Sequence, residues 1–149
     1  FQLKRQRYKL LRGLSMKVID DVVVDELVNN AHLSERKRAH YLLHTSHQDK
    51  VQRLIITMVK GSYVEPHFHE LPNQWELFLV LKGVVEFCLY DDSGSFIKKI
   101  FLGPEQFVQI IEIKPLEIHS VKCISDVAVM LEIKEGPFDE KKAKVLTSW

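Results

Sequence analysis

Residues 66–83 read PHFHELPNQWELFLVLKG: two histidines one residue apart, a short polar interruption, and a glutamate that begins an apolar run. Side chains at positions i and i+2 of a β-strand point to the same face of the sheet. If this segment is extended, His67 and His69 therefore present two imidazoles side by side. A surface pair or a hydrogen-bonded core pair gives the same spacing, so the pattern alone leaves both interpretations open.

The chain from Val51 onward consists of short β-branched or aromatic runs separated by turn residues. The runs are VQRLIITMV, YVEPHFH, WELFLVL, VVEFCLY, SFIKKIF, FVQIIEI, IHSVKCI and VAVMLEIK. Short connections without intervening helices favour an antiparallel sandwich or barrel. Apolar residues at helical spacing after Asp20 predict a short helix, within a helical part at about residues 20–45. The predicted fold is mainly β, a small antiparallel β-barrel or jelly roll with a short N-terminal helical segment.

The length and composition indicate one ordinary globular domain. The 149 residues are 46% hydrophobic and 28% charged, and the net charge is +1. Residues 1–15 carry five Lys and Arg side chains and no acid. We interpret them as a basic N-terminal extension, added to the native chain or solvated, and residues 16–149 as a single domain. No membrane span or secretory signal is recognised, and the main body lacks a basic surface. We expect a cytoplasmic protein with no nucleic-acid or membrane partner.

Two later residues extend the histidine pattern. Glu76 begins the next predicted strand, and His119 begins another one further along. If the strands at 63–69 and 76–82 are adjacent in a small barrel, Glu76 approaches the histidine pair and His119 completes the set from the opposite wall. Three imidazoles and one carboxylate suit Zn, Mn, Fe, Co or Ni and leave coordination positions for water or substrate. We predict one divalent metal ion held by His67, His69, Glu76 and His119.

The same residues carry a resemblance to a known superfamily. The spacing Gly61-x5-His67-x-His69-x6-Glu76-x6-Gly83 resembles the first cupin motif, and PLEIH at 115–119 resembles the core of the second. The segments RAHYLLH, DKVQRLIITMVKGSYVEPHFH, WELFLVLKGVVEF, DDSG, EIKPLEIHSV and LEIKEGPFD together resemble the WbuC family of cupin-fold metalloproteins. The resemblance implies a metal-binding protein linked to bacterial surface polysaccharide (O-antigen) synthesis, without implying its reaction. Two departures from the general cupin pattern are the longer loop before Glu76 and Leu116 at a usual glycine position.

Four further polar residues are candidates for positions around the ion. His44, Gln52 and Arg53 are candidate substrate-binding residues at the mouth of the barrel, and His44 and Glu132 are candidate catalytic residues. Each has a structural alternative. His44 can hydrogen-bond the N-terminal segment to the barrel, and Glu132, in the apolar run VAVMLEIK, needs a partner such as Arg53 or Lys134.

Three functions are compatible with this site. The first is an enzyme, isomerase- or epimerase-like, that acts on a sugar or sugar nucleotide through Lewis-acid metal chemistry. The second is a metal-dependent dioxygenase, and the third is a non-catalytic carbohydrate-binding or sensor module with a structural metal. In each case we expect a small oxygen-rich or anionic molecule, with Arg53 pairing with a carboxylate or phosphate. A homodimer through a sheet edge is also expected.

Overall fold

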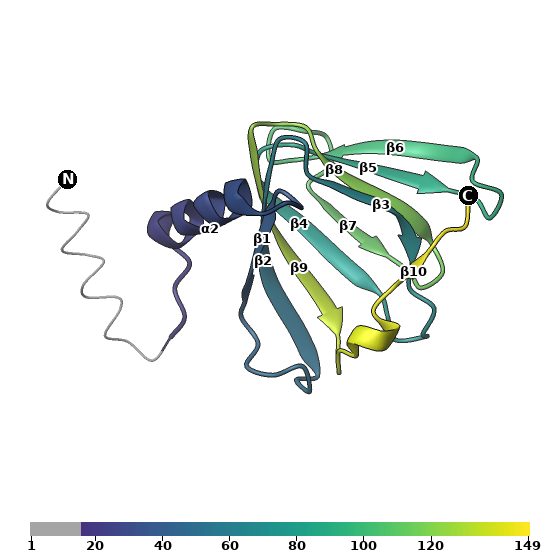
Figure 1. Cartoon of the computed structure of the whole chain (residues 1–149), viewed down its shortest axis with the longest axis horizontal. Coiled ribbons are helices and arrows are strands. Elements are labelled where there is room, and N and C mark those ends of the chain that lie inside the picture. Colours follow the sequence, from purple (N-terminus) through teal and green to yellow (C-terminus); the bar gives the residue numbers. More distant parts are fainter. Residues whose placement is uncertain (1–15) are drawn as a thin grey trace, which may run out of the picture.

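The computed structural model describes residues 16–149, so the predicted basic extension at 1–15 lies outside the described residues. Two five-stranded antiparallel sheets pack face to face (Figure 1). The first has the order β1 (Arg38–Leu42), β2 (Val51–Val59), β9 (Val127–Glu135), β4 (Glu76–Lys82) and β7 (Ile110–Ile113). The second has the order β10 (Val145–Leu146), β3 (Tyr63–Phe68), β8 (Ile118–Cys123), β5 (Val85–Tyr90) and β6 (Phe96–Leu102). The mainly β, antiparallel prediction is confirmed.

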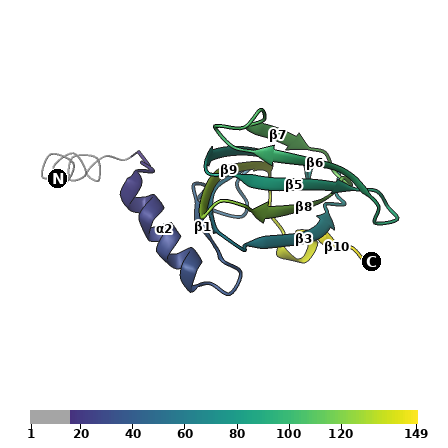
Figure 2. The same ribbon diagram turned by 90° about the horizontal axis from the view of Figure 1, so that it is seen from above.

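Helix α2 (Asp21–Leu33) covers part of the outer face of the first sheet. The Asp20 side chain caps it by accepting a hydrogen bond of 3.0 Å from the backbone N–H of Val23. Buried Leu27 packs against Ile55 of β2 and Val129 of β9. Figures 1 and 2 show the helix beside β1 and β2, outside the space between the two sheets. The predicted short N-terminal helix is confirmed.

The expected extension of helical structure to about residue 45 is wrong. The helix ends at Leu33, and Ser34 has extended backbone angles. Residues 38–42 then form β1, which pairs antiparallel with β2. The charged residues 35–37 between the helix and β1 form a turn, in which Lys37 has a positive φ of 54°. Pairing along the edge of β2 thus prevails over local helix propensity, because it satisfies a row of backbone groups.

The main core lies between the sheets. Met58 on β2 and Val80 on β4 face Phe87 on β5 and Leu102 on β6, and all are almost fully buried. The turn between β4 and β5 requires glycine at Gly83, where φ is +75° and a Cβ atom would collide with the carbonyl oxygen of Val127. These apolar side chains fill one part of the space between the sheets. The buried polar side chains, among them His67, His119 and Glu132, lie in another part of the same space.

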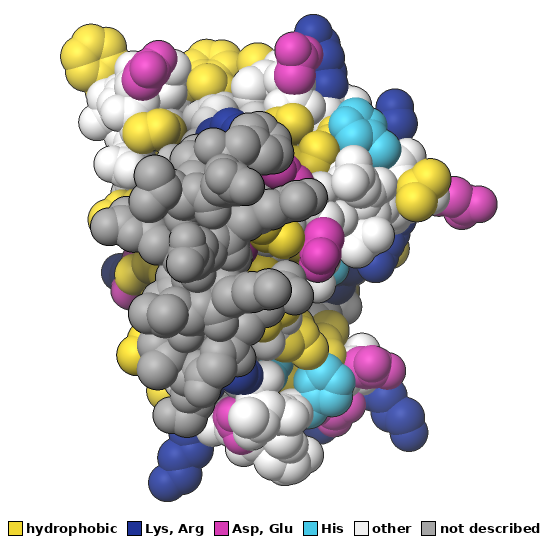
Figure 3. Space-filling view, turned by 90° about the vertical axis from the view of Figure 1, so that its left-hand side faces the viewer, with side chains coloured by type: hydrophobic (Ala, Val, Ile, Leu, Met, Phe, Trp, Pro, Cys, Tyr) yellow, Lys and Arg dark blue, Asp and Glu magenta, His cyan; other side chains and the backbone are white. Residues whose placement is uncertain are grey.

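The surface carries charges of both signs. On the face shown in Figure 3, Lys and Arg side chains stand apart from one another among Asp, Glu and apolar side chains, outside the grey residues that are not described. Within residues 16–149, no helix has the length and apolarity that a membrane crossing requires.

Candidate metal centre

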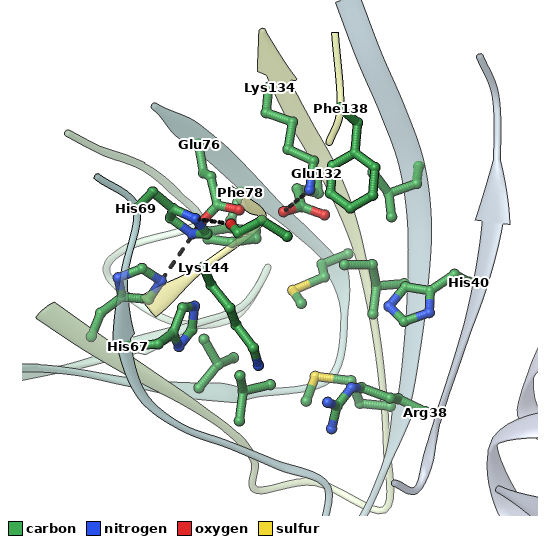
Figure 4. A pocket seen from close by; sticks show the side chains of 18 of the residues that line it. Arg38, His40, His67, His69, Glu76, Phe78, Glu132, Lys134, Phe138 and Lys144 are labelled. Carbon is green, nitrogen blue, oxygen red and sulfur yellow. Dashed lines mark hydrogen bonds and ion pairs between the residues drawn. The ribbon is translucent and has the colours of Figure 1, made fainter. Parts of the chain in front are cut away.

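The four predicted ligands come together at one point between the sheets. One candidate ligand atom from each of His67, His69, Glu76 and His119 lies within 4.8 Å of the others, and all four residues are buried. The Glu76 Oε2 atom lies 2.9 Å from His69 Nε2 and 3.6 Å from His119 Nε2. Figure 4 shows His67, His69 and Glu76 directed toward a common space. The proximity predicted from the sequence is therefore present in the structure.

The strand pairing that creates this cluster differs from the expected one. His67 on β3 is the direct cross-strand partner of His119 on β8, and their ring centroids are 4.3 Å apart. Glu76 begins β4, which belongs to the other sheet. Glu76, not His119, thus approaches the histidines from the opposite wall, and the cluster joins the two sheets.

Backbone carbonyl groups orient all three imidazoles in the same way. The Nδ1–H groups of His67, His69 and His119 donate to the carbonyl oxygens of Glu65, Ala143 and Glu117, at 2.8, 2.6 and 2.9 Å. A carbonyl oxygen only accepts hydrogen bonds, so each ring carries a proton on Nδ1 and directs its Nε2 atom toward the cluster. Such outer hydrogen bonds are typical of metal-binding histidines.

A divalent ion fits the unsatisfied polar groups of the cluster. His119 Nε2 is fully buried and has no hydrogen-bond partner within the described residues. An unpaired buried polar atom costs about 1–3 kcal/mol, and coordination to an ion would remove this cost. The donor set of three imidazole nitrogens and one carboxylate also suits a transition metal. Both the orphaned nitrogen and the ligand chemistry therefore favour an ion at this point.

The protonation states favour the same conclusion. Burial and the neighbouring His119 lower the pKa of His67 to about 4, so its imidazole is neutral near pH 7. Burial alone would raise the pKa of the Glu76 carboxyl, but the imidazoles of His119 and His69 beside it bring it well below its usual value. Burial likewise acts to lower the pKa of His69, and the Glu76 carboxylate raises it instead. A neutral His67 imidazole and an ionised Glu76 carboxylate are the forms that bind metal, whereas an ion at His69 would displace the proton that Glu76 favours there.

Glu132 lies beside this cluster. It is on β9 opposite Phe78 of β4, is buried, and lines the same cavity as the four ligands. Its Oε1 atom is 3.6 Å from Lys134 Nζ, so Lys134, one of the two expected partners, pairs with it. Burial and the charge of Glu76 raise the pKa of Glu132 to about 8. The candidate carboxyl group is therefore near the ligands and accessible from the cavity.

The other three candidates do not line the cavity. The His44 Nδ1 atom accepts a hydrogen bond of 2.9 Å from the backbone N–H of Arg53, and Arg53 faces Asp49 at 3.8 Å. The buried Gln52 amide donates to the carbonyl oxygens of residues 46, 47 and 49. These contacts hold the β1–β2 connection together, which is the structural alternative considered for His44. Arg53 points away because Leu54 and the alternate residues after it supply the cavity face of β2.

The cavity adjoining the four ligands has a volume of about 500 Å³. Its walls are largely apolar, with Leu54, Ile56 and Met58 from β2 facing Val64 and Val121 from the second sheet. Apart from the four ligands and Glu132, its polar lining consists of His40 and of four cations, Arg36, Arg38, Lys134 and Lys144. Sequence reasoning missed this cationic lining, because the three cations outside β9 lie in a segment that was expected to be helical or at an unassigned C-terminus.

Comparison with solved structures identifies the fold. An oxalate oxidase in complex with the substrate analogue glycolate matches with a TM-score of 0.56 and 13% identity over 76% of this chain and 56% of that chain. The DMSP lyase DddQ from Ruegeria pomeroyi DSS-3 matches with a TM-score of 0.56 and 22% identity, over 74% and 51% of the two chains. A cupin superfamily protein from Desulfitobacterium hafniense matches with a TM-score of 0.52 and 23% identity, over 70% and 85%. The two-sheet architecture is thus that of a cupin, and this chain spans about half the length of the oxidase and lyase chains.

Comparison of the sequence gives the family. A search of curated protein sequences finds no match. A family profile described as a domain of unknown function, DUF6016, matches residues 19–102, which include His67, His69 and Glu76, while His119 lies beyond the matched region. Because the match covers more than half of the 149 residues, the chain belongs to the DUF6016 family, and it has the cupin fold.

Proposed function

We propose that this protein is a metal-dependent cupin that holds one divalent ion through His67, His69, Glu76 and His119 and acts on a small oxygen-rich molecule in the adjoining cavity. The observation that carries the proposal is the unpaired His119 Nε2 atom, fully buried within a convergent set of metal ligands. The cavity begins at these ligands, so a molecule inside it can reach the coordination positions that the protein leaves open.

The ion would supply Lewis-acid chemistry by polarising a carbonyl or hydroxyl oxygen of the bound molecule. Glu132 is the candidate for moving a proton, and this role is supported by the position of its carboxyl in the cavity wall, on the strand next to Glu76. Lys134, 3.6 Å away, provides the positive charge that balances the ionised form of this carboxyl. The apolar walls lower the polarity around the ligands and strengthen the electrostatic interactions there.

The resemblance of the motif segments to the WbuC family suggests the substrate class, a sugar or sugar nucleotide of bacterial surface polysaccharide synthesis. An open three-histidine, one-glutamate site is also compatible with a dioxygenase, and the identity of the native metal separates the two. Iron supports oxygen chemistry, whereas zinc supports Lewis-acid chemistry. The cavity that continues from the ligands argues against a purely structural ion. A homodimer and a cytoplasmic location stay predictions from the sequence.

Metal analysis of the purified protein tests the binding site. We expect one ion per chain in the wild type and none in the His67→Ala, His69→Ala double variant, with the sheets still folded by circular dichroism. The matched control is His32→Ala, which changes a histidine exposed on α2, outside the cluster, and should keep the ion. A double variant with full metal content would contradict the site.

Ligand-induced stabilisation tests the role of the cavity. Glycolate, a small oxygen-rich anion, should raise the melting temperature of the metal-loaded protein and have no such effect after the metal is removed by a chelator. Equal stabilisation of both forms would show that the ligand does not bind at the ion.

A further inference from the structure

Two cations from different sheets meet at the cavity. Arg38 is on β1, at the edge of the first sheet, and Lys144 directly precedes β10, at the edge of the second. In Figure 4 their side chains extend toward the same part of the cavity from opposite sides. Both also line a second hollow of about 270 Å³ with Tyr63, Val64 and Glu65. These two side chains therefore stand between the main cavity and this outer hollow.

The positive charge at this position is not balanced by ion pairs. Within residues 16–149, Arg36, Arg38 and Lys144 form no salt bridge, and the Arg38 guanidinium donates only to the carbonyl oxygens of Arg36 and Tyr63, each at 3.3 Å. Burial and the charge of Arg36 lower the pKa of Arg38, and burial and Arg38 lower the pKa of Lys144. Glu65 is the nearby carboxylate that offsets part of this repulsion. Uncompensated cations beside a cavity favour an anionic ligand.

The lining between the cations and the metal ligands is apolar. Val64 on β3 pairs with Val121 on β8 in the same strand pair as His67 and His119, and Met58 on β2 pairs with Arg38 on β1. These side chains and Ile56 line the cavity and offer no side-chain hydrogen bonds to a ligand. Burial against this wall favours a short hydrocarbon segment or ring of the ligand, and the hydroxyl groups of an oxygen-rich ligand, a sugar derivative included, are favoured at the metal end. The cavity thus presents three chemically different regions in sequence: metal ligands, apolar wall and paired cations.

We propose that the cavity binds a bifunctional acid: one oxygen-rich end coordinates the metal, a short apolar body lies against the wall, and a second anionic group, carboxylate or phosphate, pairs with Arg38 and Lys144. The metal-bound end rests on the proposed function, and the second anionic subsite is independent of the reaction that takes place there. The second anion would replace water around two partly desolvated cations with charge-assisted hydrogen bonds.

Matched pairs of acids provide the test. Isothermal titration of the metal-loaded protein would compare the α,ω-dicarboxylates from succinate to suberate with the monocarboxylates of equal chain length. We expect one dicarboxylate length to bind at least about tenfold more tightly than its monocarboxylate, since a charge-assisted hydrogen bond contributes this much or more. The ω-phosphonocarboxylate of that length distinguishes the two anions. Tighter binding than the dicarboxylate assigns the subsite to phosphate, and weaker binding assigns it to carboxylate.

Variants locate the subsite. Arg38→Gln and Lys144→Gln should each remove most of the dicarboxylate advantage while changing monocarboxylate affinity less than about twofold. Lys144 is exposed, so its variant is expected to fold even if the Arg38 variant, which loses its bonds to backbone carbonyls, does not. The control Lys98→Gln, which changes an exposed cation on β6 away from the cavity, should alter neither affinity.

The possible failures are distinguishable. If monocarboxylates bind through the ion and no dicarboxylate exceeds them, the second subsite is refuted and the proposed function stands. If the dicarboxylate advantage persists in both variants, the subsite lies elsewhere and the inference is wrong. If neither class of acid nor glycolate binds the metal-loaded protein, the inference and the proposed function fall together.

Discussion

Replacing His119 with phenylalanine tests whether the unpaired nitrogen of the cluster is meant for a metal. The His119 ring is fully buried and stacks on Phe87, with centroids 5.3 Å apart and an interplanar angle of 20°. A phenyl ring preserves this stacking, and its one additional ring atom can extend into the cavity that His119 lines. The substitution therefore removes the metal ligand while retaining most of the packing.

The expected magnitude follows from the two ring nitrogens. Loss of the Nδ1 hydrogen bond to Glu117 costs about 0.5–1.5 kcal/mol, and removal of the buried, unpaired Nε2 atom returns about 1–3 kcal/mol. The stability of metal-free His119→Phe should thus lie between about 0.5 kcal/mol below and about 2.5 kcal/mol above that of the metal-free wild type. His119→Ala loses the packing as well and should be less stable by about 2–5 kcal/mol.

The metal-loaded proteins should show the opposite order. At a metal concentration 100 times the dissociation constant, binding adds about 2.7 kcal/mol to the wild-type stability. Even changes outside the ligand shell reduce metal affinity by about 10–100-fold, and loss of a ligand is at least as severe. A 100-fold loss leaves His119→Phe a gain of only about 0.4 kcal/mol at the same metal concentration.

Urea unfolding with and without chelator measures both effects for the three proteins. Two results would refute the reasoning. If metal-free His119→Phe is destabilised as much as His119→Ala, the imidazole makes polar interactions that the structure lacks. If His119→Phe keeps the full metal-dependent stabilisation, His119 is not a ligand.

Three further predictions concern residues around the centre. Arg53→Gln should leave acid binding unchanged and reduce stability by less than about 1 kcal/mol, because the pair with Asp49 is long and partly exposed; an affinity change in titration would contradict this placement. Deletion of residues 143–149 removes the carbonyl that orients His69 and should weaken metal binding by about 10–100-fold in a competition assay, whereas unchanged affinity would show that this carbonyl is dispensable. Burial and nearby cations lower the pKa of His40 to about 4, so the unfolded chain binds more protons and wild-type stability should fall as the pH drops from about 6.5 to about 4. His40→Asn should lose less unfolding free energy over that pH range in metal-free denaturation curves. Because the side chain is partly exposed, the difference from the wild type will be smaller than the pKa shift of His40 alone implies. Identical curves would show that His40 does not cause the pH dependence.

The sequence predicted the strands that have β-branched or aromatic runs. It did not predict the two strands, β1 and β10, that depend on pairing with a neighbouring strand. All eight predicted runs contain observed strands, because their residues suit a pleated, half-buried surface and glycine or polar turns separate them. Strand β1 was expected to be helical, and its extended form depends on the backbone groups of β2 along the sheet edge. Strand β10 has only Val145 and Leu146, too few residues for any periodic signal.

The candidate site shows the same division between local and long-range information. The His67 and His69 pair is a local feature, and its spacing predicted a common direction correctly. The choice of partner for β3 is not local, and the expected neighbour β4 proved to be in the opposite sheet. The predicted convergence of the four ligand residues was nevertheless correct, because Glu76 can reach the histidines from the opposite sheet as well as from a neighbouring strand. Arg53 was predicted to bind substrate but does not line the cavity, because neighbouring residues of β2 point to opposite faces of the sheet and Leu54, not Arg53, lines the cavity.

The two ends of the cavity are formed by different parts of the fold. The metal ligands come from β3, the start of β4 and β8, inside the two sheets, whereas Arg38 and Lys144 come from the edge strand β1 and the residue preceding β10. Edge additions differ most easily between proteins that share a fold, because they disturb few contacts in the core. Solved cupins at 13–23% identity show the fold, while the lining of the cavity must be read from this chain itself. A ligand screen should therefore keep the metal-binding end constant and vary the distal group. Such a screen examines the part of the cavity near Arg38 and Lys144, at the sheet edges.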